Sequence, residues 1–304
     1  MNAAQMESYR QRLNLEGAIF SRIDHEEGIV AVVYKIVKND GVCLILKISD
    51  RVHDYLREVH FLNYFAGKLP VPKVIKVVPP EKDLPGAILM ECLPGHLLKS
   101  GEFGGELAFD LGQKLAVIHL ERYSGYGDPM KGDLYNDPRI YFSLKFEEGL
   151  QECREALSIN LIKQCERYYK AHVDLLANVD GPCIVHRDYR PGNIIVDDEE
   201  KLQGIIDWAG ARASFAEEDF CSMEHGEWAF FPGSKTPFLE GYKSIRPLPR
   251  YDQIMPLLRL SKAIATIGYT TKSGISKSRG AKLTRWNLDY LEQLMLLEPI
   301  EKNH

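Results

Sequence analysis

The stretch from Cys183 to Ala211, CIVHRDYRPGNIIVDDEEKLQGIIDWAGA, constrains the fold more than any other part of this sequence. Two short apolar runs, Ile194–Val196 and Leu202–Ile206, flank the charged connector Asp197–Lys201. Runs of this length joined by a polar connector predict a β-hairpin. Because a hairpin reverses the chain, it brings the residues before its first strand next to the residues after its second strand.

Three polar residues stand at the open end of this predicted hairpin. Asp188 and Asn193 precede the first strand, and Asp207 ends the second. Transfer of a γ-phosphoryl group needs oxygen ligands for metal ions and a separate carboxylate that receives the proton of the attacking hydroxyl. We expect Asn193 and Asp207 to hold Mg²⁺ and Asp188 to be the catalytic base. Each residue alone fits a turn or cap equally well, but H-R-D-x-x-x-x-N followed by strand, turn, strand and Asp predicts phosphoryl transfer.

This region resembles the aminoglycoside/choline-kinase-like phosphotransferases, which are small-molecule kinases that share the protein-kinase fold. The resemblance implies an α+β, two-lobed protein-kinase-like fold, with a small β-rich N-terminal lobe and a larger, mainly helical C-terminal lobe. It also implies ATP or GTP as the co-substrate. The family usually has Gly where Arg187 stands, so the HRD triplet looks like that of a protein kinase. The resemblance rests on His186-Arg187-Asp188, Pro191-Gly192-Asn193 and Ile206-Asp207-Trp208.

The chain is expected to divide at a hinge. We predict an N-terminal nucleotide-binding lobe over residues 1–92, a hinge over 93–96, and a catalytic and substrate-binding lobe over 97–304. An apolar strand that ends in the turn Leu-Pro-Gly indicates the hinge. By the resemblance, the main-chain groups of Glu91 and Leu93 meet the adenine edge.

A lysine inside an apolar strand points to a nucleotide contact. The β-branched runs Ile29–Val37 and Val42–Ile48 predict a hairpin, and Lys47 lies within the second run. The amphipathic segment Val52–Ala66 predicts a helix in which Glu58 borders the buried face. We expect Glu58 to pair with Lys47 and to hold it on the nucleotide phosphates. The alternative is an edge-strand lysine and a solvated glutamate.

The expected phosphate-covering loop lacks the usual glycines. A kinase lobe carries glycines in its first hairpin so that backbone amides approach the phosphates. Here Asp24–Ile29 contains one glycine and three carboxylates. Phosphate affinity, and the choice between ATP and GTP, therefore stay open. The sequence contains no GxxxxGK[ST], which excludes a P-loop kinase.

The second lobe begins with a predicted core helix over Glu106–Leu120, in which His119 is expected to make a structural hydrogen bond. Two further helices are predicted over Ile140–Cys153 and Ile159–Leu176. In antibiotic kinases this region forms part of the acceptor-binding wall. Four acids could face an aminated acceptor or simply solvent: Glu147, Glu148, Glu152 and Glu155.

Residues around the catalytic loop are expected to support it. The family places an Asp after the second metal ligand as a brace, and Asp219 is the candidate here, with a helix N-terminal acid as the alternative. His186 belongs to the same supporting set, and Arg187 is expected in a local ion pair. The segment Glu224–Phe231 sets acids beside aromatics, which suits a sugar or amine acceptor as well as core packing.

Charge and composition exclude several classes of protein. The net charge of −5 and the pI near 6.0 argue against an extended nucleic-acid surface, and a cationic small acceptor is compatible with them. Neither a signal-peptide core nor an apolar run long enough for a membrane span occurs in the sequence. Six scattered cysteines favour reduced thiols. We expect a cytoplasmic protein that binds neither nucleic acid nor membrane.

The function predicted is transfer of the γ-phosphoryl of ATP or GTP to a hydroxyl of a small molecule, an aminoglycoside-type antibiotic or a related amino sugar or amino alcohol. A protein kinase is the first alternative, although Trp208 follows Asp207 in place of Phe-Gly and no APE motif follows. A nucleotide-binding pseudokinase is the second, motivated by the acidic loop Asp24–Glu27. The identity of the acceptor and the oligomeric state stay open.

Overall fold

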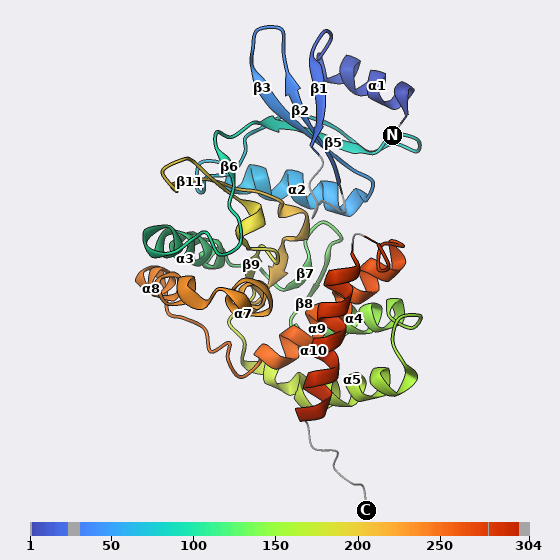
Figure 1. Ribbon diagram of the computed structural model, residues 1–304, viewed down its shortest axis with the longest axis vertical. Helices are drawn as coiled ribbons and strands as arrows, with labels where there is room; N and C mark the ends of the chain where they lie inside the picture. The colour runs from blue at the N-terminus through green and yellow to red at the C-terminus, as the bar shows by residue number, and fades with distance from the viewer. Residues whose placement is uncertain (1, 24–30, 279, 298–304) are drawn as a thin grey trace, which may run out of the picture.

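A five-stranded antiparallel sheet forms the N-terminal end of the molecule, with a mainly helical region below it (Figure 1). The computed structural model describes residues 2–23, 31–278 and 280–297. The strand order in the sheet is β1-β2-β3-β5-β4. This is the α+β arrangement that the sequence predicts. The strands are β1 (Ile19–Ile23), β2 (Ala31–Val37), β3 (Cys43–Ser49), β4 (Val74–Val78) and β5 (Gly86–Glu91).

Two helices accompany this sheet. Helix α2 (Val52–Phe65) matches the predicted helix to within one residue, and the chain leaves it through Gly67 at φ 78°. Helix α1 (Ala3–Leu13) was not predicted, although the sequence carries its start signal. Asn2 accepts from the Gln5 amide at 2.9 Å and Gln5 accepts from the Asn2 amide at 3.0 Å, which is a capping box.

The C-terminal region contains two small sheets, of order β11-β10-β6 and β8-β7-β12-β9. Their strands are β6 (His96–Leu97), β7 (Tyr126–Asp128), β8 (Asp133–Tyr135), β9 (Cys183–Val185), β10 (Ile194–Val196), β11 (Leu202–Ile205) and β12 (Arg212–Ser214). The helices are α3 (Gly105–Leu120), α4 (Pro138–Glu152), α5 (Ile159–His172), α6 (Glu217–Ser222), α7 (Trp228–Phe230), α8 (Lys235–Ile245), α9 (Met255–Lys272) and α10 (Ala281–Leu297). Short 3₁₀ turns cover Val173–Asn178, Pro191–Asn193, Trp208–Gly210 and Pro232–Ser234, and one π-turn covers Met223–Glu227.

The predicted helices of this region are present with adjusted ends. Helix α4 starts two residues early because the Asp137 side chain caps it, accepting from the Arg139 amide at 2.9 Å. The single helix predicted over Ile159–Leu176 is wrong in extent, since α5 ends at His172 and a 3₁₀ turn follows. The predicted tail Glu298–His304 lies outside the described residues. No helix in the described ranges combines the length and apolarity that crossing a membrane requires.

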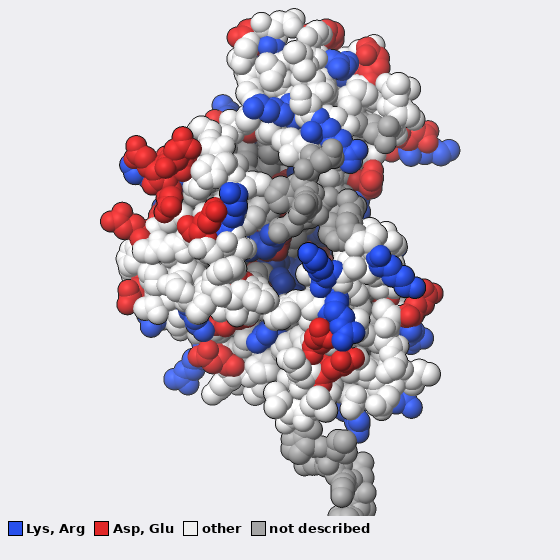
Figure 2. Space-filling model, in the orientation of Figure 1, with Lys and Arg blue, Asp and Glu red and all other residues white. Residues whose placement is uncertain are grey.

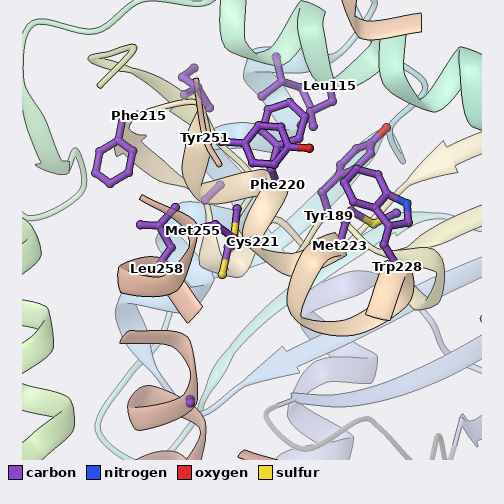
Figure 3. Packing of buried hydrophobic residues seen from close by; sticks show 14 of the residues in the cluster. Leu115, Tyr189, Phe215, Phe220, Cys221, Met223, Trp228, Tyr251, Met255 and Leu258 are labelled. Atoms are coloured by element: carbon purple, nitrogen blue, oxygen red, sulfur yellow. The ribbon is translucent and has the colours of Figure 1, made fainter. Parts of the chain in front are cut away.

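Two hydrophobic cores fix the arrangement. The smaller core lies between the five-stranded sheet and α1. The larger core fills the helical region, where Tyr189, Phe220 and Trp228 pack together with residues of α3 and α9 (Figure 3). Helix α2 joins this larger core, because Phe61 and Phe65 are fully buried and their rings lie 6.4 and 4.7 Å from the ring of Trp208. Packing of α2 on Trp208 therefore sets the position of the sheet relative to the loop that follows β11.

Candidate active site

The hairpin β10–β11 brings the three predicted polar residues to one place. Both strands start where the sequence predicts, and β11 ends one residue earlier than expected. The Asn193 carbonyl accepts from the Ile206 amide at 3.0 Å, so Asp207 lies one residue beyond the cross-strand partner of Asn193. Asp207 itself has a left-handed backbone, at φ 65°. The reversal of the chain thus places residues 193 and 207 at the same end of the hairpin.

Asp188 is held by two neighbours in its own loop. Asn193 donates its Nδ2 to Asp188 Oδ2 at 2.7 Å and to the Asp188 carbonyl at 2.8 Å. Arg190 donates its Nε to both carboxylate oxygens of Asp188, at 3.1 and 3.2 Å. The Asp188 side chain remains 38% exposed. A carboxylate fixed in orientation and open on one side can accept a proton from a bound hydroxyl.

Lys47 bridges the sheet, α2 and the hairpin. Its Nζ lies 2.7 Å from Glu58 Oε2, as the sequence predicts, and also 2.7 Å from Asp207 Oδ1, which the sequence did not reveal. Burial alone would lower the pKa of Lys47, but the Asp207 and Glu58 carboxylates raise it well above its usual value. The Lys47 ammonium in turn lowers the pKa of Asp207. Lys47 is therefore a fixed cation beside an ionised Asp207.

The Asp219 carboxylate holds the backbone of the loop that contains Asp188. Its carboxylate accepts the backbone amides of His186 at 2.8 Å and Arg187 at 2.5 Å, and it lies 3.0 Å from His119 Nε2. Burial lowers the pKa of His119 despite this contact, and Tyr242 meets its other ring nitrogen at 2.8 Å. His119 is thus a buried structural residue. Asp219 also lies in the first turn of α6. The same residue therefore contacts the loop and stands at the start of a helix, which were the two alternatives.

His186 and Arg187 directly precede Asp188 in its loop. His186 Nε2 lies 3.1 Å from the Ile206 carbonyl and therefore ties the loop to the hairpin. Arg187 has a left-handed backbone, at φ 69°, which explains physically why glycine suits this position in related sequences. Its guanidinium forms the expected local ion pair, but only loosely, with Nε 4.0 Å from Glu218 Oε2.

Arg57 is a residue that sequence reasoning missed. From α2, it donates to the Ala209 carbonyl at 2.6 Å, to Asp128 at 2.6 Å and to Asp54 at 2.5 Å. These bonds tie the helix that carries Glu58 to the loop that follows Asp207. The pattern of α2 shows only the i, i+3 pair of Arg57 with Asp54, because its other two partners come from β7 and from the loop that follows β11.

The predicted hinge lies between β5 and β6. The Glu91 amide donates to the Lys73 carbonyl at 3.0 Å. The Leu93 side chain packs against Gly204, where an added Cβ would lie 2.1 Å from Leu93 Cδ1. Gly95 has φ 102°, and a Cβ there would lie 2.1 Å from the Val196 carbonyl oxygen. Only glycine fits this close approach of the hinge to the hairpin.

The acids of α4 carry less free charge than the sequence suggests. Glu148 pairs with Lys145 at 2.5 Å, and Glu152 pairs with Lys272 at 2.5 Å. Glu147 lines the same surface depression, of about 480 Å³, together with these two acids. In the segment 224–231, Trp228 is 5% exposed and belongs to the core, whereas Phe230 is 58% exposed. The acidic loop Asp24–Glu27 lies outside the described residues.

The donor atoms at the hairpin fit a magnesium ion. The Nδ2 of Asn193 is used on Asp188, which leaves its Oδ1 for a cation, and Asp207 has one oxygen on Lys47 and one remaining. Within residues 2–23, 31–278 and 280–297, no three His, Cys, Asp or Glu side chains gather as a dense metal cage. One carboxylate and one amide oxygen suit Mg²⁺, which keeps most of its water ligands.

The family follows from a comparison of the sequence with known families. A phosphotransferase enzyme family (APH) matches residues 24–252. The chain therefore belongs to this family of phosphotransferase enzymes. No curated protein matches the chain.

Solved structures share the whole fold at low sequence identity. A thermostable mutant of aminoglycoside phosphotransferase APH(4)-Ia, in ternary complex with AMP-PNP and hygromycin B, is 12% identical, with a TM-score of 0.69 over 97% of this chain and 98% of that chain. The gentamicin complex of APH(2")-IIa is 15% identical, with a TM-score of 0.68 over 98% and 99%. Macrolide 2'-phosphotransferase type I is 17% identical, with a TM-score of 0.64 over 97% and 98%. These likenesses confirm the predicted protein-kinase-like fold.

Proposed function

We propose that this enzyme transfers the γ-phosphoryl group of ATP, or of GTP, to a hydroxyl of a small molecule. The observation that carries the proposal is the convergence of Asp188, Asn193, Asp207 and Lys47, linked by contacts of 2.7 Å. AMP-PNP in the ternary complex of a structural relative supports an adenine nucleotide as the donor. The boundaries of the nucleotide lobe (1–92), hinge (93–96) and catalytic lobe (97–304) belong to the same proposal.

Each residue of the site has a separate role in the reaction. Lys47, held by Glu58, binds the nucleotide phosphates, while the Glu91 carbonyl and the Leu93 main chain meet the adenine edge. Asn193 and Asp207 hold Mg²⁺, which neutralises charge on the phosphate oxygens when bound. The Lys47 ammonium lowers the pKa of Asp207 and keeps it ionised, although burial acts in the opposite direction. Each of these groups is fixed by a neighbour before substrate arrives, which is the preorganisation that phosphoryl transfer needs.

Asp188 receives the proton in the transfer step. The acceptor oxygen forms a bond to the γ-phosphorus, its proton passes to the Asp188 carboxylate, and the bond from the γ-phosphorus to the β–γ bridging oxygen breaks to leave the nucleoside diphosphate. His186, Arg187 and Asp219 position this loop through the contacts described above. The acceptor classes follow the relatives, whose complexes and names include hygromycin B, gentamicin and macrolides. An amino sugar or amino alcohol therefore belongs in the first acceptor screen.

An Asp188→Ala variant tests this allocation of roles. A positioned base contributes about 10²- to 10⁴-fold to a proton-transfer step, so kcat should fall by that factor on any accepted hydroxyl compound. The Kd for AMP-PNP should stay within a factor of two or so, because among the described residues no hydrogen bond joins Asp188 to Lys47 or to the hinge. The matched control is Asp198→Asn, which changes a fully exposed carboxylate in the turn of the same hairpin.

The assay couples nucleotide consumption, with ATP and GTP in parallel, to a panel of aminoglycosides, macrolides, choline and amino sugars. Turnover that survives Asp188→Ala unchanged would refute the assignment of the base. Labelling of protein substrates in place of small alcohols would favour a protein kinase. Tight binding of ATP and Mg²⁺ with no turnover on any acceptor would favour a nucleotide-binding pseudokinase.

A further inference from the structure

Two arginines share one glutamate beside the catalytic loop. Arg212 is buried and donates to Glu218 Oε1 at 2.6 Å. Arg187 Nε lies 4.0 Å from the other oxygen of the same carboxylate, and the Arg187 side chain is 39% exposed. Within the part of the chain that the structure describes, the Arg187 guanidinium makes no hydrogen bond. Partial burial and the Arg212 charge lower the pKa of Arg187, so the fold stabilises this cation poorly.

The acids that contact Arg57 and the loop around Asp188 are already engaged. Asp54 and Asp128 both accept from Arg57, at 2.5 and 2.6 Å. Asp219 uses its two oxygens on the backbone amides of the catalytic loop and on His119. The Arg187 guanidinium is therefore the member of this cluster whose charge lacks a hydrogen-bonded partner, and a partly buried cation of this kind favours an anion.

The backbone of Arg187 is held in a conformation that side chains disfavour. Its φ of 69° lies in the left-handed region, where glycine is preferred. The Asp219 carboxylate fixes its amide, and the Ser222 hydroxyl donates to its carbonyl at 2.9 Å. Strain of this kind is retained where the surroundings over-determine it, and it clusters at functional sites. Arg187 is thus a rigidly mounted cation next in sequence to Asp188.

Lys262 is a second cation that contacts Ser222. From α9, its Nζ donates to the Ser222 hydroxyl at 2.9 Å, and that hydroxyl donates in turn to the Arg187 carbonyl. No ion pair joins Lys262 to a carboxylate among the described residues. Through the Ser222 hydroxyl, Lys262 is therefore linked to the backbone of Arg187. Figure 2 shows Lys and Arg side chains, in blue, inside a hollow in the middle of the molecule.

We propose that Arg187 and Lys262 bind an anionic group of the acceptor, a phosphate, sulfate or carboxylate, while the acceptor hydroxyl meets Asp188. This inference rests on the proposed function and narrows its acceptor to a hydroxylated small molecule that carries an anionic group. A guanidinium presents a planar fork of donors that matches such oxyanions. The acids Glu148 and Glu152 of α4, which the sequence offered as partners for an aminated acceptor, are already paired with lysines.

Inorganic sulfate is the probe that tests the site without a known acceptor. Equilibrium dialysis with labelled sulfate is carried out at constant ionic strength and with saturating AMP-PNP and Mg²⁺, so that nucleotide phosphates occupy Lys47. Arg187→Gln should weaken sulfate binding roughly 10- to 150-fold, the range for a hydrogen bond to a charged group. Arg187→Lys should keep part of the affinity. Arg285→Gln, which removes an exposed arginine on α10, should change nothing.

Equal sulfate affinity in the wild-type protein and Arg187→Gln, or no saturable binding to the wild type, would overturn the inference. Failure of the proposed function appears separately, as a lack of AMP-PNP binding in the same samples.

Arg187→Gly separates anion binding from a structural role. Glycine suits φ 69°, so the free energy of unfolding should match or exceed that of the wild type, while sulfate affinity falls as in Arg187→Gln. If the ion pair with Glu218 is what Arg187 provides, stability falls in Arg187→Gly and sulfate affinity is unchanged. That pair of results would contradict the proposal. In an acceptor screen, sugar phosphates and sugar acids should show lower KM than their neutral analogues, and only in proteins that keep Arg187.

Discussion

Replacing Lys47 by methionine removes the one cation that two carboxylates share. Its Nζ lies 2.7 Å from both Glu58 Oε2 and Asp207 Oδ1, and the Glu58 side chain is 2% exposed, so the variant leaves a buried carboxylate without its cation. Breaking a buried ion pair in this way costs about 3–5 kcal/mol. Burial already raises the pKa of Glu58, so the carboxyl can protonate instead. We therefore expect the lower end, a loss of about 3 kcal/mol in the free energy of unfolding.

The double variant Lys47→Met/Glu58→Gln separates stability from function. It removes both buried charges, so the free energy of unfolding should return to within about 1 kcal/mol of the wild type. Asp207 is 44% exposed and can be solvated by water in this variant. AMP-PNP binding should stay weak in both variants, because neither carries the cation for the nucleotide phosphates. Urea unfolding followed by tryptophan fluorescence gives the stabilities, and calorimetry gives the Kd for AMP-PNP.

Lys76→Met is the matched control, because it removes an exposed lysine from strand β4 of the same sheet. Such a surface change should stay within about 0.5 kcal/mol of the wild type. The reasoning fails if Lys47→Met is as stable as the wild type. It fails equally if the double variant binds AMP-PNP as tightly as the wild type.

Two further predictions concern Glu217 and the hinge. Burial raises the pKa of Glu217 from 4.5 to about 7, so the folded protein holds this proton more tightly than the unfolded chain does. The contribution of Glu217 to stability is therefore complete below pH 4.5 and falls by about 3 kcal/mol as the pH rises through 7. Glu217→Gln should flatten the curve of unfolding free energy between pH 4.5 and 8, and an unchanged slope would contradict this. Gly95→Ala places a Cβ 2.1 Å from the Val196 carbonyl oxygen and should lower the free energy of unfolding. The loss should be about 2 kcal/mol larger than for Gly132→Ala, because Gly132 also has a positive φ but a Cβ there meets nothing within 4 Å. Equal losses of unfolding free energy in urea would refute the close contact.

Local patterns made much of the site predictable. The β10–β11 hairpin depends on neighbouring residues, and its first strand begins and ends where the sequence indicates. The period of α2 placed Glu58 on the face towards Lys47, and their 2.7 Å contact confirms that pairing. Both predictions needed only strand and helix periodicity, which nearby residues encode.

Contacts between distant segments were not predictable in the same way. The Lys47–Asp207 contact joins residues 160 positions apart, and it depends on how α2 packs on Trp208. Arg57 likewise meets partners from α2, β7 and the loop after β11. Helix α1 was missed for a different reason: its polar surface hides the periodicity, and only the capping box of Asn2 and Gln5 marks it.

The charge around α4 was likewise not predictable from the sequence alone. The acids of α4 suggested a site for an amine when only their sequence was considered. Lys272 belongs to α9, far along the chain, and its 2.5 Å contact with Glu152 neutralises one of them. Conversely, Arg187 and Glu218 stand far enough apart, at 4.0 Å, to leave a cation exposed beside Asp188. Such charge balances become visible only when the helices are in place.

The position of a divalent cation in a complex with AMP-PNP is the most direct test of the site. Crystals grown with Mn²⁺ in place of Mg²⁺ would give an anomalous peak that identifies the ion independently of turnover. The account predicts that Asn193 Oδ1 and an Asp207 carboxylate oxygen both lie within about 2.3 Å of that peak, close to the distance expected for Mg²⁺. An ion bound elsewhere, with neither residue among its ligands, would contradict it.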